Sequence, residues 1–285
     1  MGRHARITLL LAGVAVLLAL LSLWPRSANP PDTQAAITGI SSETISRIRI
    51  ERPGAEAVHM ERHTDGWRLT APLQAPAHPA RVNGLLSLLG EPSLSTLAVV
   101  VTDLARFQLE PPNVTLYLDD EQFEFGDSTV LDSNRYLRYR DTVHVVADTV
   151  YFQFHQDPGF FVDTRLLPPD TKVRELRLPS LTLTRVKGSW HAEPALPDSD
   201  DAAHDVVREW RSARALTVRR LEDAPDAATV IVETADGTFQ FQVRSSDTGV
   251  ILARPALGIQ YHLDADVASR LLLLSAPAAA TAPER

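Results

Sequence analysis

The chain has 285 residues, of which 28 are Lys or Arg and 36 are Asp or Glu, so its net charge at neutral pH is −8. An acidic surface of this kind is a poor match for nucleic acid, which we therefore do not expect as a partner. The chain has no cysteine, which excludes disulfides, thiol nucleophiles and thiolate metal sites. Its stability must come from packing, and its length suits one large domain or two small ones.

The first predicted element is an uncharged apolar run over residues 7–24. A helix of this length spans roughly 27 Å, close to the hydrocarbon thickness of a bilayer. Basic residues precede the run, which predicts a cytoplasmic stub and transmembrane anchor at 1–26 with the body on the other side. Arg26 interrupts the small-residue pattern of a cleavage site, so an uncleaved anchor is favoured over a cleaved signal peptide. The expected location is the bacterial inner membrane, single-pass, with the C-terminal body in the periplasm.

Ala12, Ala15 and Ala19 lie on one face of this predicted helix, at spacings of i, i+3 and i+7. Small residues let membrane helices approach closely, so these alanines are the predicted transmembrane contact with another helix. An anchor that is exposed to lipid on all sides is the alternative.

Two segments lack the pattern of a folded element. Residues 27–43 begin as a polar, proline-bearing stretch and are predicted to be a linker. Residues 275–285 are rich in Ala, Pro and Thr without a large apolar side chain, which predicts a disordered tail.

Between linker and tail the sequence repeats once. Three short strands are predicted at 45–50, 58–62 and 66–72, and three similar ones at 173–178, 181–185 and 189–194. Trp67 and Trp190 take equivalent places, each just after a turn-forming pair. The prediction is two similar units, at 44–157 and 158–274.

Each unit continues with a helix, at 79–89 and at 202–213, and ends with one, at 148–155 and at 266–274. Between the helices, four strands alternate apolar and polar residues, with Phe123 aligned to Phe239. These strands are expected at 114–118, 122–125, 136–139 and 143–146, and at 229–232, 238–241, 250–252 and 260–263. Alternation with period two indicates antiparallel sheets with one solvated face. The predicted fold class is α+β: an N-terminal transmembrane helix followed by two similar units of antiparallel sheet with packed helices.

The nearest approach to a metal site is His59, Glu61 and His63, which would share one face of a strand. The acid is in the wrong place for the zinc-protease H-E-x-x-H motif, so a solvated strand face is the favoured interpretation. No phosphate loop, dinucleotide fingerprint or serine-nucleophile motif occurs. We therefore predict no catalytic residue and no cofactor. Trp67 and Trp190 could stack on sugars, but their equivalent placement favours core packing.

Several short motifs in the first unit resemble a known family. They are Trp67-Arg-Leu-Thr-Ala-Pro, Ala80-Arg-Val, Phe107-Gln-Leu-Glu-Pro-Pro, Phe125-Gly126 and Asn134-Arg-Tyr136. Together they resemble an uncharacterised bacterial domain-of-unknown-function family over roughly residues 44–155. The resemblance implies a single-anchor envelope protein, of a kind often encoded beside gliding-motility-type ABC transporters. Gln108 departs from the pattern, because the family usually has a glycine there, and a tight turn is less expected as a result.

The leading hypothesis is a non-catalytic, membrane-anchored periplasmic accessory or scaffold protein of an envelope complex, associated with an ABC-type transporter. Its partners would be the inner membrane, through residues 7–24, and a membrane-protein complex. The first alternative is a glycan- or peptide-binding module that uses a groove between the units. The second is a metal-dependent hydrolase that uses His59 and His63.

Overall fold

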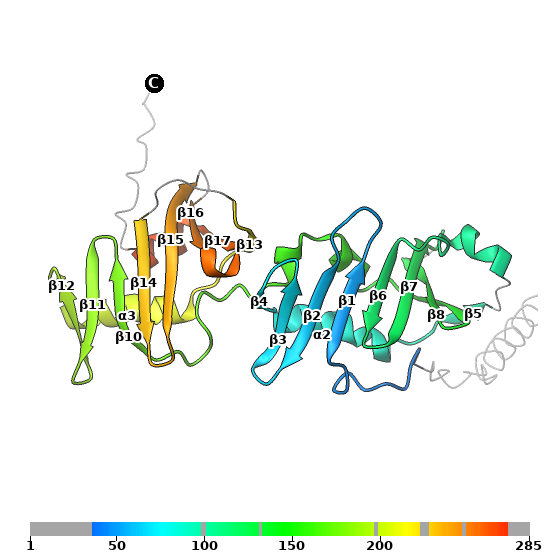
Figure 1. Ribbon diagram of the computed structural model, residues 1–285, viewed down its shortest axis with the longest axis horizontal. Coiled ribbons are helices and arrows are strands. Elements are labelled where there is room, and N and C mark those ends of the chain that lie inside the picture. The colour runs from blue at the N-terminus through cyan, green and yellow to red at the C-terminus, as the bar shows by residue number, and fades with distance from the viewer. Residues whose placement is uncertain are drawn as a thin grey trace, which may run out of the picture.

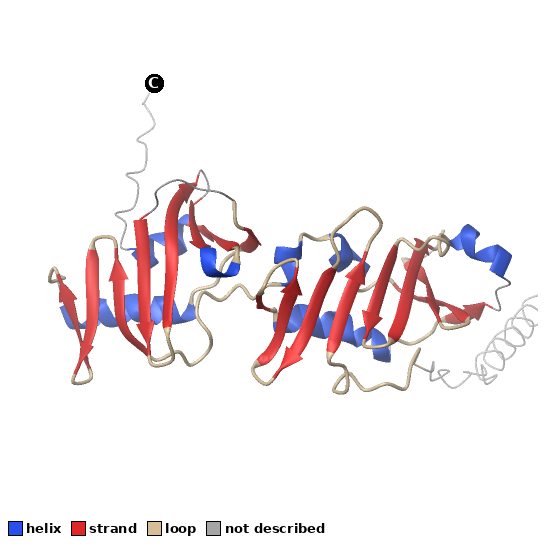
Figure 2. Ribbon diagram, viewed as in Figure 1, coloured by secondary structure: helices blue, strands red, loops and turns tan. Residues whose placement is uncertain are grey.

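The computed structural model describes residues 36–97, 101–130, 133–196, 199–222, 228–246 and 249–272. Two antiparallel sheets lie side by side along the longest axis (Figure 1), and the longer helices cover one face of each sheet (Figure 2). The expected anchor, its alanines 12, 15 and 19, and the expected tail lie outside the described residues. Within the ranges that the structure describes, no helix is long and apolar enough to cross a membrane.

The first sheet has nine strands in the order β4-β3-β2-β1-β6-β7-β8-β9-β5. Its strands are β1 Arg47–Glu51, β2 Val58–His63, β3 Gly66–Ala71, β4 Ala75–Pro76, β5 Ser95–Leu97, β6 Val114–Leu118, β7 Glu121–Ser128, β8 Asn134–Tyr139 and β9 Thr142–Ala147. We call this sheet and its helices the first unit.

The second sheet has eight strands in the order β12-β11-β10-β14-β15-β16-β17-β13. Its strands are β10 Val173–Leu178, β11 Leu181–Val186, β12 Ser189–Glu193, β13 Thr217–Arg220, β14 Ala228–Thr234, β15 Thr238–Ser246, β16 Gly249–Arg254 and β17 Ile259–Asp264. This sheet and its helices form the second unit. Without β4, the first sheet has the same strand order as the second, so the two units share one topology.

The helices are few and mostly short. The α-helices are α2 Pro79–Leu86, α3 Ser199–Ser212 and α4 Ala265–Leu272, and the 3₁₀ helices are η1 Ser87–Gly90, η2 Val101–Phe107, η3 Tyr151–His155, η4 Pro158–Phe161 and η5 Pro255–Leu257. In α2, Val82, Leu85 and Leu86 are buried against the sheet, as their helical spacing predicts. In α3, the indole of Trp210 is fully buried, and its N–H donates to the carbonyl oxygen of Leu271 in α4, 2.9 Å away.

The expected α+β fold class is wrong, and the N-terminal transmembrane helix expected with it lies outside the described residues. The protein is mostly antiparallel sheet, with 48% strand and 22% helix. The expected helix at 79–89 is α2 followed by a 3₁₀ turn, and the one at 148–155 is only the short η3. Meanwhile β15 runs on to Ser246, and β4, β5 and β13 add strands that the alternation did not indicate.

The alignment of Phe123 with Phe239 is also wrong. In the first sheet, Ile48 pairs with Leu118, which pairs with Glu121. In the second, Leu176 pairs with Val232, which pairs with Phe239. Phe239 therefore occupies the place of Glu121 and is half-buried, whereas the counterpart of Phe123 is the fully buried Phe241.

The motifs behind the family resemblance pack against one another in the first unit. A side chain at Gly126 would meet the carbonyl oxygen of Phe107, and the Phe107 and Tyr136 rings lie 4.5 Å apart. Arg135 is 9% exposed and donates to the carbonyl oxygen of Gly126 at 2.6 Å. Gln108 has a φ of +53°, so the tight turn is present although glycine is not. These motifs therefore take part in the packing of the first unit.

Candidate functional site at the junction of the two units

The chain that connects the two units pairs with both of them. On one side, Ala77 and Val162 form an antiparallel bridge, and the N–H of Asp163 donates to the carbonyl oxygen of Pro76 at 2.9 Å. On the other side, Arg165 bridges to Arg214, and the N–H of Ala215 donates to the carbonyl oxygen of Thr164 at 2.8 Å. The connecting segment therefore forms isolated β-bridges with both units.

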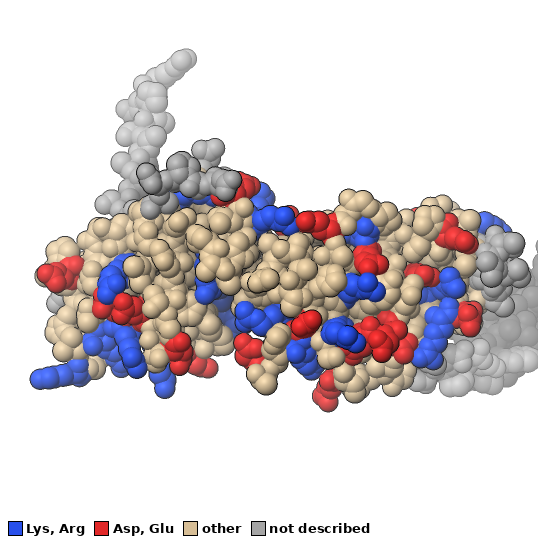
Figure 3. All heavy atoms as spheres, viewed as in Figure 1, with Lys and Arg blue, Asp and Glu red and all other residues tan. Residues whose placement is uncertain are grey.

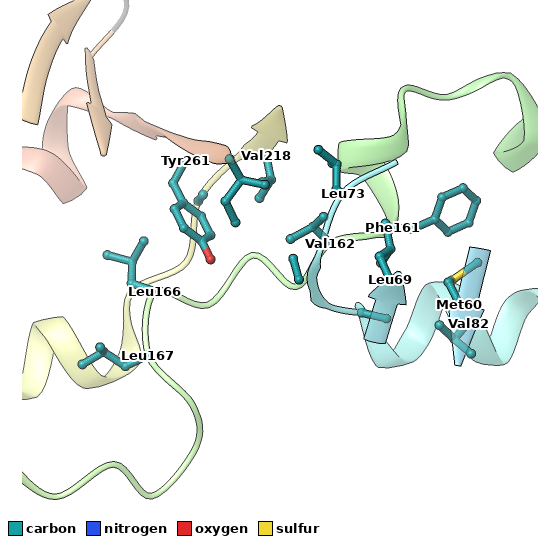
Figure 4. Close-up of a cluster of buried hydrophobic side chains, with 14 of the residues drawn as sticks. Met60, Leu69, Leu73, Val82, Phe161, Val162, Leu166, Leu167, Val218 and Tyr261 are labelled. Atoms are coloured by element: carbon teal, nitrogen blue, oxygen red, sulfur yellow. The ribbon is translucent and has the colours of Figure 1, made fainter. Parts of the chain in front are cut away.

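Apolar side chains fill the space on either side of this segment. Figure 4 shows Leu73 and Val162 facing Val218 and Tyr261 across the junction, with Leu166 below them. All of these side chains are buried, and they belong to one hydrophobic cluster that continues into both sheets. At Gly159, a side chain would meet the carbonyl oxygen of Val218, so η4 lies directly against β13. The units are thus packed against each other as well as connected.

A cavity of about 370 Å³ opens at this junction. The first unit lines it with Trp67, Arg68 and Pro76, and the second unit with Arg254 and Tyr261. The connecting segment contributes Asp163 and residues 165–169. Trp67 is only half-buried here, with the guanidinium of Arg62 5.0 Å from its ring centre. Trp190, its counterpart, is buried at 5% exposure. The two tryptophans thus have different surroundings, despite their equivalent places in the sequence.

The charged groups of the cavity are largely paired. Arg165 holds Asp163 through its Nη2, 2.5 Å from Oδ2, and through its Nε at 2.8 Å, and this hydrogen bonding raises the pKa of Arg165. Burial raises the pKa of Tyr261, so its hydroxyl keeps its proton at neutral pH. The guanidinium of Arg254 lies 4.8 Å from the centre of the Phe239 ring. The cavity thus offers an aromatic face and hydrogen-bond donors, a combination that is typical of binding.

His78 lies beside this cavity, at the start of α2. Its backbone N–H donates to the carbonyl oxygen of Phe161 at 2.7 Å. Burial, together with the nearby Arg81, lowers the pKa of its imidazole, and Asp163 opposes this effect. Its Nδ1 is buried and has no hydrogen-bond partner in the part of the chain that the structure describes. The imidazole is therefore neutral at pH 7.

The residues suggested for a metal site lie elsewhere, on β2 of the first unit. His59 is half-buried and pairs with Ala71, whereas Glu61 and His63 are exposed. The pairing of β2 with β3 is irregular between His59 and Met60. Among the described residues, no group of three or more His, Asp or Glu side chains is arranged to hold a metal ion.

Sequence reasoning placed a groove between the units but missed the residues that line it. Asp163, Arg165, Arg254 and Tyr261 come from the connecting segment and from the end of the second sheet. No local spacing brings them together, because only the packing of one unit on the other does so. The one sequence signal was Trp67, whose ring was assigned to the core.

The fold defines a duplicated antiparallel-sheet protein with a cavity at the junction of its units. A family model described as "Domain of unknown function (DUF4340)" matches residues 67–234, more than half of the chain. The chain belongs to this family. The match begins at Trp67 and continues through the connecting segment into β14, and it ends before Arg254 and Tyr261 of the cavity. No curated protein and no solved structure matches the chain.

Proposed function

We propose that this protein is a non-catalytic accessory or scaffold protein of a bacterial envelope complex, associated with an ABC-type transporter. Its sheets would lie in the periplasm, and the inner membrane would be a partner through residues 7–24. The observation that carries the proposal is the junction, where a shared segment and a continuous apolar cluster join two copies of one sheet. Two sheets that are joined in this way form a rigid support, which suits a protein that holds other proteins at fixed positions.

Two sequence features support the location and the partner. The apolar run at 7–24 follows basic residues and has the length that a bilayer requires. The motifs from Trp67 to Tyr136 resemble those of envelope proteins that are often encoded beside gliding-motility-type ABC transporters. The structure gives these motifs packing roles, which agrees with a role in assembly.

The test is purification of the tagged full chain from its native membranes in mild detergent, followed by mass spectrometry of the proteins that elute with it. Membranes that contain the untagged chain are the control. We expect an ABC permease or ATPase subunit in stoichiometric amount. A chain that elutes alone, or that turns over a substrate, would contradict the proposal.

The cavity favours a second candidate function, a glycan- or peptide-binding module. Trp67 supplies a partly exposed aromatic face, and Arg68 and Arg254 supply donors around it. An aromatic ring beside polar groups is a common way to bind a sugar or a peptide side chain.

Thermal-shift measurements on the full chain with envelope glycans and short peptides test this candidate. A ligand that raises Tm in the wild type should lose its effect in Trp67→Leu. Tyr117→Leu is the matched control, because Tyr117 also lies under an arginine, with Arg49 3.8 Å from its ring centre, but far from the junction. A flat result across the panel, or equal loss in both variants, would count against binding at the cavity.

A further inference from the structure

The second unit has a basic cleft between α3 and one end of its first three strands. The cleft has a volume of about 300 Å³, and its cations are Lys172, Arg185, Arg208 and Arg211. Its apolar lining includes Trp190, and among the described residues no Asp or Glu lines it. The face of the molecule seen in Figure 3 carries Lys and Arg side chains together with Asp and Glu side chains. In a chain with a net charge of −8, the cleft is a local reversal of sign.

Most of these cations have no acidic partner. Arg208 pairs with Asp205 on its own helix at 2.7 Å. Lys172, Arg185 and Arg211 form no ion pair with any residue in the described ranges. By contrast, arginines along the outer face of the first sheet are paired, for example Arg49 with Glu51 at 2.8 Å. The cleft therefore concentrates positive charge, of which only Arg208 has an acidic partner among the described residues.

The equivalent arginine of the first unit shows what Arg185 lacks. Arg62 and Arg185 lie directly opposite Trp67 and Trp190 in their respective sheets. The Nη2 of Arg62 donates to the carbonyl oxygen of Ser42 at 2.8 Å, so its guanidinium is already engaged. The guanidinium of Arg185 is exposed in the cleft and has no such partner among the residues described.

The strand that carries Trp190 is also the edge of its sheet. In the first unit, β4 covers the outer edge of β3, and the chain that follows β4 pairs in turn with Val162. In the second unit, no strand in the described ranges pairs with the outer edge of β12. An unpaired edge offers its N–H and C=O groups to an added strand. The first unit thus shows, within the same chain, how extended segments cover this edge.

We propose that the cleft and the edge of β12 together bind an extended acidic segment of a partner protein. The segment adds to the sheet beside β12, and its carboxylates lie against Arg185, Arg208 and Arg211. Side chains of an added strand alternate between the two faces, so acids at every second position would all reach the cleft. This inference rests on the proposed function, since it names the chemistry of the partner that an accessory protein would hold.

The first experiment measures peptide binding to the full chain in detergent by fluorescence anisotropy. The probe is a labelled decapeptide in which Glu alternates with Thr, and its control is the same peptide with Gln in place of Glu. We expect the Glu peptide to bind at least about tenfold more tightly, and its affinity to fall as salt is raised. Equal binding of the two peptides would overturn the proposal, and so would complete competition by inorganic phosphate or by anionic lipid vesicles.

Variants locate the site. The double variant Arg185→Gln, Arg211→Gln should weaken binding of the Glu peptide by about tenfold. The matched control is Arg106→Gln, Arg219→Gln, which removes two exposed positive charges away from the cleft and should leave binding unchanged. Hydrogen exchange at Ser189–Glu193 should slow when the peptide binds, because strand addition protects the edge. Loss of affinity in both double variants, or unchanged exchange in β12, would overturn the proposal.

Failure of this inference is distinguishable from failure of the proposed function. If the envelope complex elutes with the chain but is retained equally by Arg185→Gln, Arg211→Gln, the proposed function stands and the cleft is not its binding site. If the peptide binds in the cleft but no complex elutes with the chain, the inference stands and the accessory role fails.

Discussion

The two units share a strand order but differ in what covers the edge beside their third strand. In the first unit, β4, the connecting segment and the second unit surround Trp67. In the second unit, Trp190 is covered by α3, and β12 remains an unpaired edge within the described residues. The comparison teaches that the fold depends on what the copies share, whereas the candidate binding surfaces depend on where they differ.

The largest expected effect is in the helix layer of the second unit. Trp210→Ala removes a fully buried indole, which lies 5.6 Å from Phe241 and hydrogen-bonds to α4. Truncation of a buried tryptophan leaves a cavity, so we expect the free energy of unfolding to fall by about 4 kcal/mol. Urea unfolding followed by circular dichroism measures this. Trp67→Ala, at a half-buried site, should lower the free energy of unfolding much less. Equal losses in the two variants would contradict the difference in burial between these tryptophans.

The buried Arg135 makes its hydrogen bonds within the first unit. Arg135→Met removes hydrogen bonds to Gly126 and to Asp148, the latter at 2.8 Å, and leaves Asp148 unpaired. We expect a loss of about 3 kcal/mol, because breaking a buried ion pair strands the other charge. Hydrogen exchange should increase in β7 and β8 but not in the second sheet. The matched Arg138→Met breaks a more exposed pair with Glu124 and should cost under about 1 kcal/mol.

The turn at Gln108 should gain stability from a glycine at this position. A left-handed conformation is strained for side chains other than glycine, so Gln108→Gly should stabilise the first unit by about 1 kcal/mol. Thermal unfolding measures the change. Gln108→Ala keeps the strain and serves as the control; an equal gain in Ala would show that φ is not the cause.

Each sheet has a histidine on the strand that pairs with its last strand, β9 beside β5 and β17 beside β13. Both histidines predict the same dependence of the free energy of unfolding on pH. Burial lowers the pKa of His144 in β9, and burial followed by Arg219 lowers the pKa of His262 in β17. The unfolded chain, with a pKa of about 6.5, binds protons that the folded chain does not. Stability should therefore be full above about pH 6.5 and decrease as the pH falls below it.

Unfolding between pH 7.5 and 5.5 tests this dependence. His144→Gln and His262→Gln should each reduce the loss of stability at low pH. Hydrogen exchange should show the first effect in β9 and the second in β17. A pH dependence that is unchanged in both variants would contradict the assignment.

The smallest effect is expected for the ion pair that joins the units at the surface. Arg220 on β13 contacts Glu56 of the first unit at 2.5 Å, but the two side chains are 54% and 63% exposed. Exposed pairs contribute little, so a double-mutant cycle with Glu56→Gln and Arg220→Gln should give about 0.5 kcal/mol or less. A coupling above about 2 kcal/mol would mean that charge, rather than the apolar cluster, joins the units.

The sequence was sufficient where a local pattern determines the structure. The strand β6 lies at Val114–Leu118, as predicted, because its alternation buries one face against a core. The alignment of Phe239 with Phe123 failed because the β14–β15 hairpin is two residues longer before its turn than the β6–β7 hairpin. An extension by two residues keeps each side chain on the same face of the sheet but moves it to another position along the strand. Strand β5 was missed because Ser95–Leu97 is short and its partner β9 is distant in sequence.

The candidate sites depend on contacts that no local pattern encodes. The cavity needs Trp67 and Tyr261 to line the same space at the junction, and the basic cleft needs Arg185 on β11 and Arg211 on α3 to line another. The sequence repeat shows that the third strand of each unit carries a tryptophan, Trp67 in the first and Trp190 in the second. Only the tertiary structure reveals that one of these strands is covered, whereas the other is an unpaired edge within the described ranges.

The most direct test of the account places a photo-crosslinking amino acid in the full chain in its native cells. At position 204, on α3 beside the cleft, we expect a covalent adduct with a subunit of an envelope complex. At position 130 in the first unit, where Val130 is 98% exposed, we expect none. Adducts from neither position, or equally from both, would contradict an accessory protein that holds its partner through the second unit.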